Sequence, residues 1–509
     1  MQSRASMTSM KSMIRFLSTF REWKKYHILL CLLNYLHYYW AASKPMLYYQ
    51  KTPMTQQVID KCSLLVEKYH PTWYLFNGHL QTFFLALGNR FPMVPYCREL
   101  LHLDDGGLVS LDWAVPPSQI DVQQQHDHPT ILLLHGSCGG SWENYMRKAV
   151  DELMQHGWRV VVMNSRGCSK TPVLTPRLFN AADTGDIRQV VTYLRRKHVP
   201  KAPLLAVGFS LGANLLVKYL GEEGDKCQIT AAVSVGNPFD GMEIFRHMHH
   251  SSYATHKVYY RAMTKKFLRL FFEESNAHEH FVNHPTVDLK AMKSCATMWD
   301  VDQIMARKVF GYRSVNEYYR DCSSTPYVLN VKIPLLCLSA KDDPVCVHTA
   351  VPIDDCLANE NIILAMTHRG GHLGFFTGNN VFSYPETWSV QAVAQYCDVV
   401  TDLLLNRNQP EKTSKPTSKV EYKISTSNDE DQSFLKISPM PPGLEDQPVF
   451  LQAHQQQQGM HDDLMDELIL CDGVPMHQVV RLGAAFVCAC IVYSKVDHIV
   501  GRWWWCCTG

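Results

Sequence analysis

The sequence lacks several features that would assign it to a function class directly. Its 17 cysteines form no CxxC pair and no Cys/His spacing suited to zinc, and their odd number favours buried thiols over a disulfide framework. It contains no Asn-x-Ser/Thr glycosylation site. The formal net charge of +1 predicts no basic surface for nucleic acid. What is present, 46% hydrophobic and 19% charged residues, is the composition of a globular protein with a buried core.

An uninterrupted apolar run of full membrane-spanning length is also missing. Residues 26–42 are apolar and aromatic, but as a helix they would measure about 25 Å, short of the roughly 30 Å hydrocarbon core. Basic residues precede this run and aromatic residues close it. Residues 1–50 are therefore expected to be a membrane-anchor segment, single-pass with a cytoplasmic N-terminus, in the endoplasmic reticulum or plasma membrane. A helix lying on the membrane surface, or a buried helix, is the alternative.

The main domain is expected over residues 71–406, where short apolar runs alternate with helical patterns. This alternation predicts an α/β fold with a mostly parallel central sheet and helices on both faces. Residues from about 240 to 330 contain no clear strand and are too long for a structureless loop, which predicts an inserted helical cap. The expected strands are continuous apolar runs, at 108–115, 130–136, 159–165, 204–210, 229–236, 335–340 and 362–367.

Residues 407–509 have a different character and are expected to be a mostly disordered polar tail. The tail ends in a short apolar run and a Trp-rich segment, "RWWWCCTG". The tryptophans could touch a membrane interface and the cysteines could be acylated, or the segment is an exposed hydrophobic end without function. The sequence does not decide between these readings.

The strongest local signal is "LLAVGFSLGANLLVKYLG", which contains the pattern G-x-S-x-G. An apolar strand leads into Ser210 and a helical pattern follows it, as in the nucleophile elbow of hydrolases. A nucleophile at so sharp a turn needs small neighbours, here the elbow glycines Gly208 and Gly212. The amide of Leu211 would then stand at a helix N-terminus, where it stabilises an oxyanion.

A serine nucleophile needs a base, and the base needs a carboxylate that orients it. Downstream, Asp343 follows one expected strand and His372 follows the next. This is the order Ser-Asp-His found in hydrolases that carry their nucleophile on such an elbow. In "LLLHGSCGGSWENY" small residues follow another strand, which predicts the amide of Ser137 as second oxyanion donor. This glycine run has neither the lysine of a P-loop nor a dinucleotide-binding spacing, so phosphate binding is not favoured. The chemistry of Ser210, Asp343 and His372 needs no metal or organic cofactor, and none is expected.

At these residues the chain resembles the membrane-anchored α/β-hydrolase-domain-containing lipases known as AB hydrolase family 4. The resemblance covers residues 70–378 and rests on "NGHLQT", "LDDGGLVSLDW", "NSRGC", "LAVGFSLGANLLVKYLGEEG", "VFGYRSVNEYYRDCS", "IPLLCLSAKDDPV" and "THRGGHLGFF". It implies Ser210 as nucleophile, Asp343 as acid and His372 as base, and an N-terminal signal-anchor helix. One departure is His135, where many relatives have proline.

These observations predict a serine hydrolase that cleaves acyl esters of membrane lipids, as a phospholipase, monoacylglycerol lipase or carboxylesterase, with the cap as lid and apolar acyl pocket. Two alternatives stay open. One is an acyltransferase that uses the same triad, and the other is a catalytically silent hydrolase fold that serves as a binding or receptor module. Headgroup and acyl-chain preference, protein partners and oligomeric state are not readable from the sequence.

Overall fold

The computed structural model describes residues 32, 36, 40–87, 91–115, 127–250, 254–378 and 384–407. Of the predicted anchor run, residues 26–42, only 32, 36 and 40–42 are among the described residues. Of the predicted tail, residues 407–509, only Arg407 is described, and it is the last residue of a helix. Within the described ranges, no helix is both long and apolar enough to cross a membrane.

A nine-stranded mixed sheet forms the centre of the fold, in the order β1-β9-β8-β7-β6-β4-β5-β3-β2. The six strands from β9 to β5 are parallel, whereas β1, β3 and β2 are antiparallel to their neighbours. The sheet is thus mostly parallel, as predicted. Its strands are β1 (Met46–Tyr49), β2 (Tyr96–His102), β3 (Leu108–Ala114), β4 (Thr130–Leu134), β5 (Arg159–Asn164), β6 (Leu204–Phe209), β7 (Ala231–Val235), β8 (Leu335–Ala340) and β9 (Ile362–Thr367).

Two strands of this sheet were not expected from the sequence. The four-residue strand β1 pairs with β9, so the sheet includes residues N-terminal to Pro71. The strand β2 contains Arg98 and Glu99, which hide its apolar pattern. Both charges are buried with partners, since Arg98 donates to Asp112 at 2.6 Å and Trp113 donates to Glu99 at 2.9 Å. Paired charges of this kind can be buried within a strand. From the sequence alone, charged residues are usually predicted to lie on the surface.

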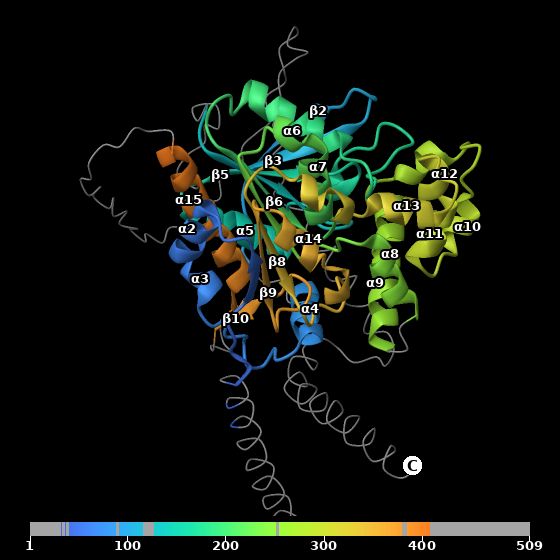
Figure 1. Cartoon of the computed structure of the whole chain (residues 1–509). Helices are drawn as coiled ribbons and strands as arrows, with labels where there is room; N and C mark the ends of the chain where they lie inside the picture. The colour runs from blue at the N-terminus through green and yellow to red at the C-terminus, as the bar shows by residue number, and fades with distance from the viewer. Residues whose placement is uncertain are drawn as a thin grey trace, which may run out of the picture.

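Helices cover both faces of the sheet, and each face has its own apolar core (Figure 1). One face packs against α2 (Pro53–Lys61), α3 (Ser63–Val66), α5 (Asn144–Gln155) and α15 (Trp388–Arg407). The other packs against α6 (Gly185–Lys197), α7 (Leu211–Glu223) and α14 (Ile353–Ala358). The parallel strands carry side chains into both cores, which explains why they are continuous apolar runs in the sequence.

Between β7 and β8 the chain forms a group of helices that lies to one side of the sheet in Figure 1. The group consists of α8 (Gly241–His250), α9 (Ala254–Arg269), α10 (Leu289–Lys293), α11 (Met298–Ile304), α12 (Ala306–Val309) and α13 (Val315–Cys322), with short helical turns at Leu270–Glu274, Ala277–Phe281 and Thr325–Asn330. Its own core, around Phe271, Phe281 and Val301, also includes Cys138 and Cys168 of the main domain. The cap is therefore fixed to the loops that follow β4 and β5.

The buried carboxyl of Asp302 makes the stability of the cap pH-dependent. Its Oδ2 accepts a 2.7 Å hydrogen bond from the Tyr319 hydroxyl, but burial dominates and raises the pKa of Asp302 from 3.8 to about 7. The folded state therefore holds a proton that the unfolded chain releases, so stability falls as the pH rises from about 4 to 7. Asp302→Asn should remove this fall and raise the melting temperature at pH 8 by on the order of 3 °C. Melting curves at pH 5 and pH 8 measure it, and an equal shift at both pH values would contradict it.

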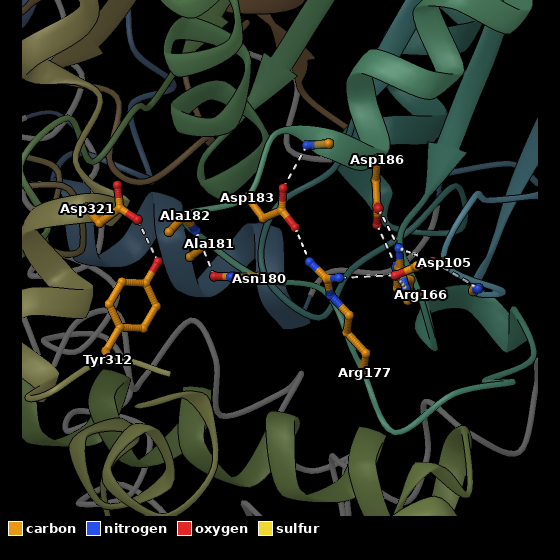
Figure 2. A network of polar contacts seen from close by, with 12 residues as sticks. Asp105, Arg166, Arg177, Asn180, Ala181, Ala182, Asp183, Asp186, Tyr312 and Asp321 are labelled. Carbon is orange, nitrogen blue, oxygen red and sulfur yellow. Dashed lines mark hydrogen bonds and ion pairs between the residues drawn. The ribbon is translucent and has the colours of Figure 1, made fainter. Parts of the chain in front are cut away.

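A cluster of charges fixes the loop after β5 (Figure 2). The Arg166 guanidinium donates to both carboxylate oxygens of Asp105, at 2.8 and 3.0 Å, and to both of Asp186, at 2.8 and 2.7 Å. Arg177 then joins Asp105 to Asp183. A Cβ at Gly107 would lie 2.2 Å from Arg166 Nη1, so the glycine leaves room for the guanidinium. The segments "NSRGC" and "LDDGG" thus meet in one structural ion-pair cluster.

Candidate active site

Ser210 stands at a sharp turn between β6 and α7, with the backbone angles φ 52° and ψ −119°. This positive φ is strained for a residue with a side chain. There is no room for a side chain at either elbow glycine, Gly208 or Gly212. A Cβ at Gly208 would lie 2.5 Å from the Gly212 carbonyl oxygen, and one at Gly212 would lie 2.4 Å from the Leu134 carbonyl oxygen. These contacts are to backbone atoms that cannot move aside, so both positions accept only glycine.

The structure brings Ser210, His372 and Asp343 together, although 162 positions separate the serine from the histidine. His372 Nε2 lies 2.9 Å from Ser210 Oγ, and His372 Nδ1 lies 2.9 Å from Asp343 Oδ2. With its proton on Nδ1, the imidazole donates to the carboxylate and accepts from the serine hydroxyl. Asp343 follows β8 and His372 follows β9, so both stand at the carboxyl edge of the parallel strands, beside the elbow that ends β6.

The Asp343 carboxylate is fixed from its other side. Its Oδ1 accepts hydrogen bonds from the amides of Val345 and Cys346, both at 2.8 Å. The side chain is 2% exposed, so water competes little for these bonds. Two amides and one imidazole satisfy the carboxylate and hold it in the orientation that the histidine needs.

The loop that carries His372 rests on α4 (Gly78–Leu87), a contact for which no residue pattern provides a chemical reason. The His372 amide donates to Thr82 Oγ1 at 2.9 Å, and the same hydroxyl donates to the Gly78 carbonyl at 2.7 Å. Gly371 has a φ of +57°, and a Cβ there would lie 2.4 Å from the Gly78 oxygen. The "NGHLQT" segment therefore positions the histidine loop without contacting Ser210 through any of these bonds. Its only sequence signal was its place in the family resemblance.

The two predicted oxyanion donors lie near the elbow. Leu211 is the first residue of α7, and within the described parts of the chain its amide and that of Ser137 make no hydrogen bond. The loop after β4 passes close to the nucleophile, since a Cβ at Gly136 would lie 3.2 Å from Ser210 Cβ. The Gly136 amide is occupied, because it donates to the Tyr145 hydroxyl at 2.8 Å. The assignment of Leu211 and Ser137 as oxyanion donors stays a prediction.

The His135 side chain holds the loop after β4 in place. Its Nδ1 lies 2.6 Å from the Gly136 carbonyl oxygen, and the Ser165 amide donates to its Nε2 at 3.1 Å. Both bonds require a neutral ring with the proton on Nδ1, and burial lowers the pKa of His135 in the same sense. The imidazole therefore ties the loop after β4 to the loop after β5.

We expect His135→Ala to lower kcat for ester hydrolysis about tenfold with little change in KM, because a displaced loop weakens an oxyanion contact made mainly in the transition state. Steady-state kinetics with a water-soluble ester measure the effect. His156→Ala, at a half-exposed position on the far end of α5, is the matched control. A pure KM effect of His135→Ala would show that the loop serves substrate binding instead.

A buried thiol, Cys346, stands next to the three predicted residues. Burial raises its pKa, so it remains a neutral thiol beside the Ser210 hydroxyl. Within the described residues, Asp343, Cys346 and His372 are the one group of potential metal ligands with donor atoms inside 4.8 Å of one another. Both oxygens of Asp343 and both ring nitrogens of His372 already have partners in the hydrogen-bonded chain. A metal would have to break that chain to bind.

Comparison with known proteins places the fold in a family. A family profile described as "alpha/beta hydrolase fold" matches residues 129–378. The chain belongs to the α/β-hydrolase family, which confirms the predicted fold class. It is 33% identical over 351 residues to a protein named "Phospholipase ABHD3" from Homo sapiens, covering 68% of this chain and 83% of that protein. The resemblance to α/β-hydrolase-domain-containing lipases is thereby confirmed.

Two further relatives extend this comparison. "Embryogenesis-associated protein EMB8" of Picea glauca is 32% identical over 369 residues, which cover 71% of this chain and 78% of that one. "Monoacylglycerol lipase" of Saccharomyces cerevisiae is 31% identical over 344 residues, which cover 59% and 75%. Relatives with the names of a phospholipase and a lipase agree with the predicted class, a carboxylic ester hydrolase.

Proposed function

We propose that this protein is a serine hydrolase that cleaves acyl ester bonds of lipids, with Ser210 as nucleophile. The observation that carries the proposal is the chain of two 2.9 Å hydrogen bonds from Asp343 through His372 to Ser210, at a strained elbow. The lipid substrate is supported by the names of the relatives, a phospholipase and monoacylglycerol lipases.

The proposed reaction has two half-reactions. Ser210 Oγ attacks the ester carbonyl while its proton passes to His372 Nε2, and the Leu211 and Ser137 amides stabilise the oxyanion. The histidine then gives this proton to the leaving alcohol, and an acyl-enzyme remains. Water attacks the acyl-enzyme with His372 as base, and the fatty acid leaves with Ser210 restored. Asp343 stabilises the imidazolium that forms in both halves.

We further propose that the protein acts at a membrane, anchored by residues 26–42 with a cytoplasmic N-terminus. Leu32, Leu36 and Trp40 belong to this run and are 52%, 46% and 87% exposed, and a spacing of four places them on one face of a helix. Tryptophan at the end of the run suits the interfacial belt of a bilayer. Flotation of the full chain with phospholipid vesicles tests the proposal, and a chain that stays in the unbound fraction would contradict it.

Covalent labelling tests the hydrolase assignment. A fluorophosphonate reacts with an activated serine, so one equivalent should add to the chain and mass spectrometry should locate the adduct on the peptide that contains Ser210. An unlabelled chain would indicate a silent binding module. Products formed with and without a lipid alcohol as acceptor distinguish hydrolysis from acyl transfer, because only transfer yields a new ester.

A further inference from the structure

A pocket of about 340 Å³ lies on the acid side of the Ser210–His372–Asp343 chain. Four separate segments line it: the start of α4, the cap helix α8, the loop after β8 and the loop that leads to His372. Asp343 is among the lining residues, whereas Ser210 is not. Most of its wall surface is apolar, but the side chains of Lys341, His348 and Arg369 bring nitrogen donors to it. Its size suits a small polar group.

The carboxylates that line this pocket have most of their bonds already. Asp343 is satisfied by two amides and His372. The Asp342 Oδ1 atom accepts from the Gly371 amide at 3.0 Å, and its Oδ2 lies 3.7 Å from Arg369 Nη1 with no hydrogen bond to any described residue. One buried acceptor, Asp342 Oδ2, is therefore left for a hydroxyl donor.

The hydrogen-bond donors that line this pocket have fewer partners than its carboxylates. Within the described ranges, the side chains of Lys341 and His348 have no hydrogen-bond or ion-pair partner, and Arg369 has only its long contact to Asp342. Lys341 and His348 are exposed at the rim, and Arg369 is half-buried. The pocket thus combines an ammonium, a guanidinium and an imidazole. Phosphate oxygens accept hydrogen bonds from each of these groups. A lipid acyl chain has no polar atom that could accept a hydrogen bond from these donors.

We propose that this pocket binds the phosphate-bearing headgroup of a glycerolipid, with Lys341, Arg369 and His348 donating to the phosphate and Asp342 Oδ2 accepting from a hydroxyl. The proposal rests on ester hydrolysis at Ser210. The two hydrogen bonds and the imidazole between them keep Asp343 Oδ2 within about 8 Å of Ser210 Oγ. In a glycerophospholipid only a few bonds separate the acyl ester from the phosphate. A headgroup in the pocket would therefore hold the ester near the nucleophile.

The first experiment measures ligand binding to the pocket in the absence of catalysis. Glycerol 3-phosphate is titrated into the full chain carrying Ser210→Ala, with and without Lys341→Ala. Loss of one charge-assisted bond should weaken binding about tenfold. Lys341→Arg should retain most of the affinity, and Lys332→Ala, another exposed lysine outside the pocket, should retain all of it. Unaltered binding in Lys341→Ala, or no binding to the parent chain, would overturn the pocket assignment.

The second experiment uses the active chain and compares a lysophospholipid with a monoacylglycerol of the same acyl length. Lys341→Ala should lower kcat/KM about tenfold for the lysophospholipid and leave the monoacylglycerol unchanged. If glycerol 3-phosphate binding weakens but this ratio does not move, the ligand is a free phosphate ester and the headgroup assignment is wrong. If the active chain hydrolyses neither lipid, the proposed function fails, and the titration still reports on the pocket.

Discussion

Ser210→Ala is expected to lower kcat/KM for ester hydrolysis by at least about 10³-fold, because the variant has no hydroxyl to form the acyl-enzyme. The fold should survive, since alanine occupies the Cβ position that Ser210 already fills at φ 52°. Hydrolysis of a short-chain soluble ester measures the loss, and an unchanged melting temperature shows that the elbow is intact. Ser294→Ala, at an exposed position in the cap, is the control and should keep full activity.

The three proposed catalytic residues should also fail as a unit. His372→Ala alone removes the base, and Ser210→Ala/His372→Ala should be no slower than Ser210→Ala, because the residual rate then comes from the oxyanion donors and binding alone. Independent contributions would instead multiply the two losses. A double variant that loses the product of both single effects would show that the 2.9 Å hydrogen bond between the two side chains is not the catalytic link.

The proximity of Ser210, Asp343 and His372 could be predicted because each follows a local pattern, a buried strand that ends in a polar residue. Asp343 and His372 come directly after β8 and β9, and parallel strands deliver their ends to one edge of the sheet. A sequence pattern therefore sufficed to place three residues in one site. Their hydrogen bonds follow from that placement.

The support of the site could not be predicted, since it depends on long-range contacts between residues without a chemical signature. The bond from the His372 amide to Thr82 spans 290 positions, and threonine inside an apolar helix looks like any other core residue. The proposed headgroup pocket is similar, because its donors come from loops after two strands and its walls from α4 and α8. Charge pairs hid β2 in the same way, since Arg98 and Glu99 interrupt its apolar pattern although each has a buried partner in β3.

Arg166→Met is expected to cost about 3 kcal/mol of folding free energy, although this residue is outside the proposed active site. Its side chain is 4% exposed and pairs with two carboxylates at once (Figure 2). Methionine fills a similar volume but leaves Asp186 without its cation and Asp105 with Arg177 alone. Removal of one partner from a buried pair typically costs about 3–5 kcal/mol. The lower end applies here, because Asp105 is 32% and Asp186 18% exposed, so water can reach both carboxylates.

Thermal unfolding at low ionic strength and neutral pH measures this effect, which should lower the melting temperature by on the order of 5 °C. Arg313→Met is the matched control, since the Arg313 side chain is 89% exposed and, among the described residues, pairs only with Glu317 on the cap surface. A surface pair of this kind contributes little, so the control should melt with the wild type. Because Arg166 joins the β2–β3 turn to the start of α6, the triple variant with Asp105→Asn and Asp186→Asn should recover part of the loss. A triple variant less stable than Arg166→Met would show that packing of the guanidinium, rather than the unpaired carboxylates, sets the cost.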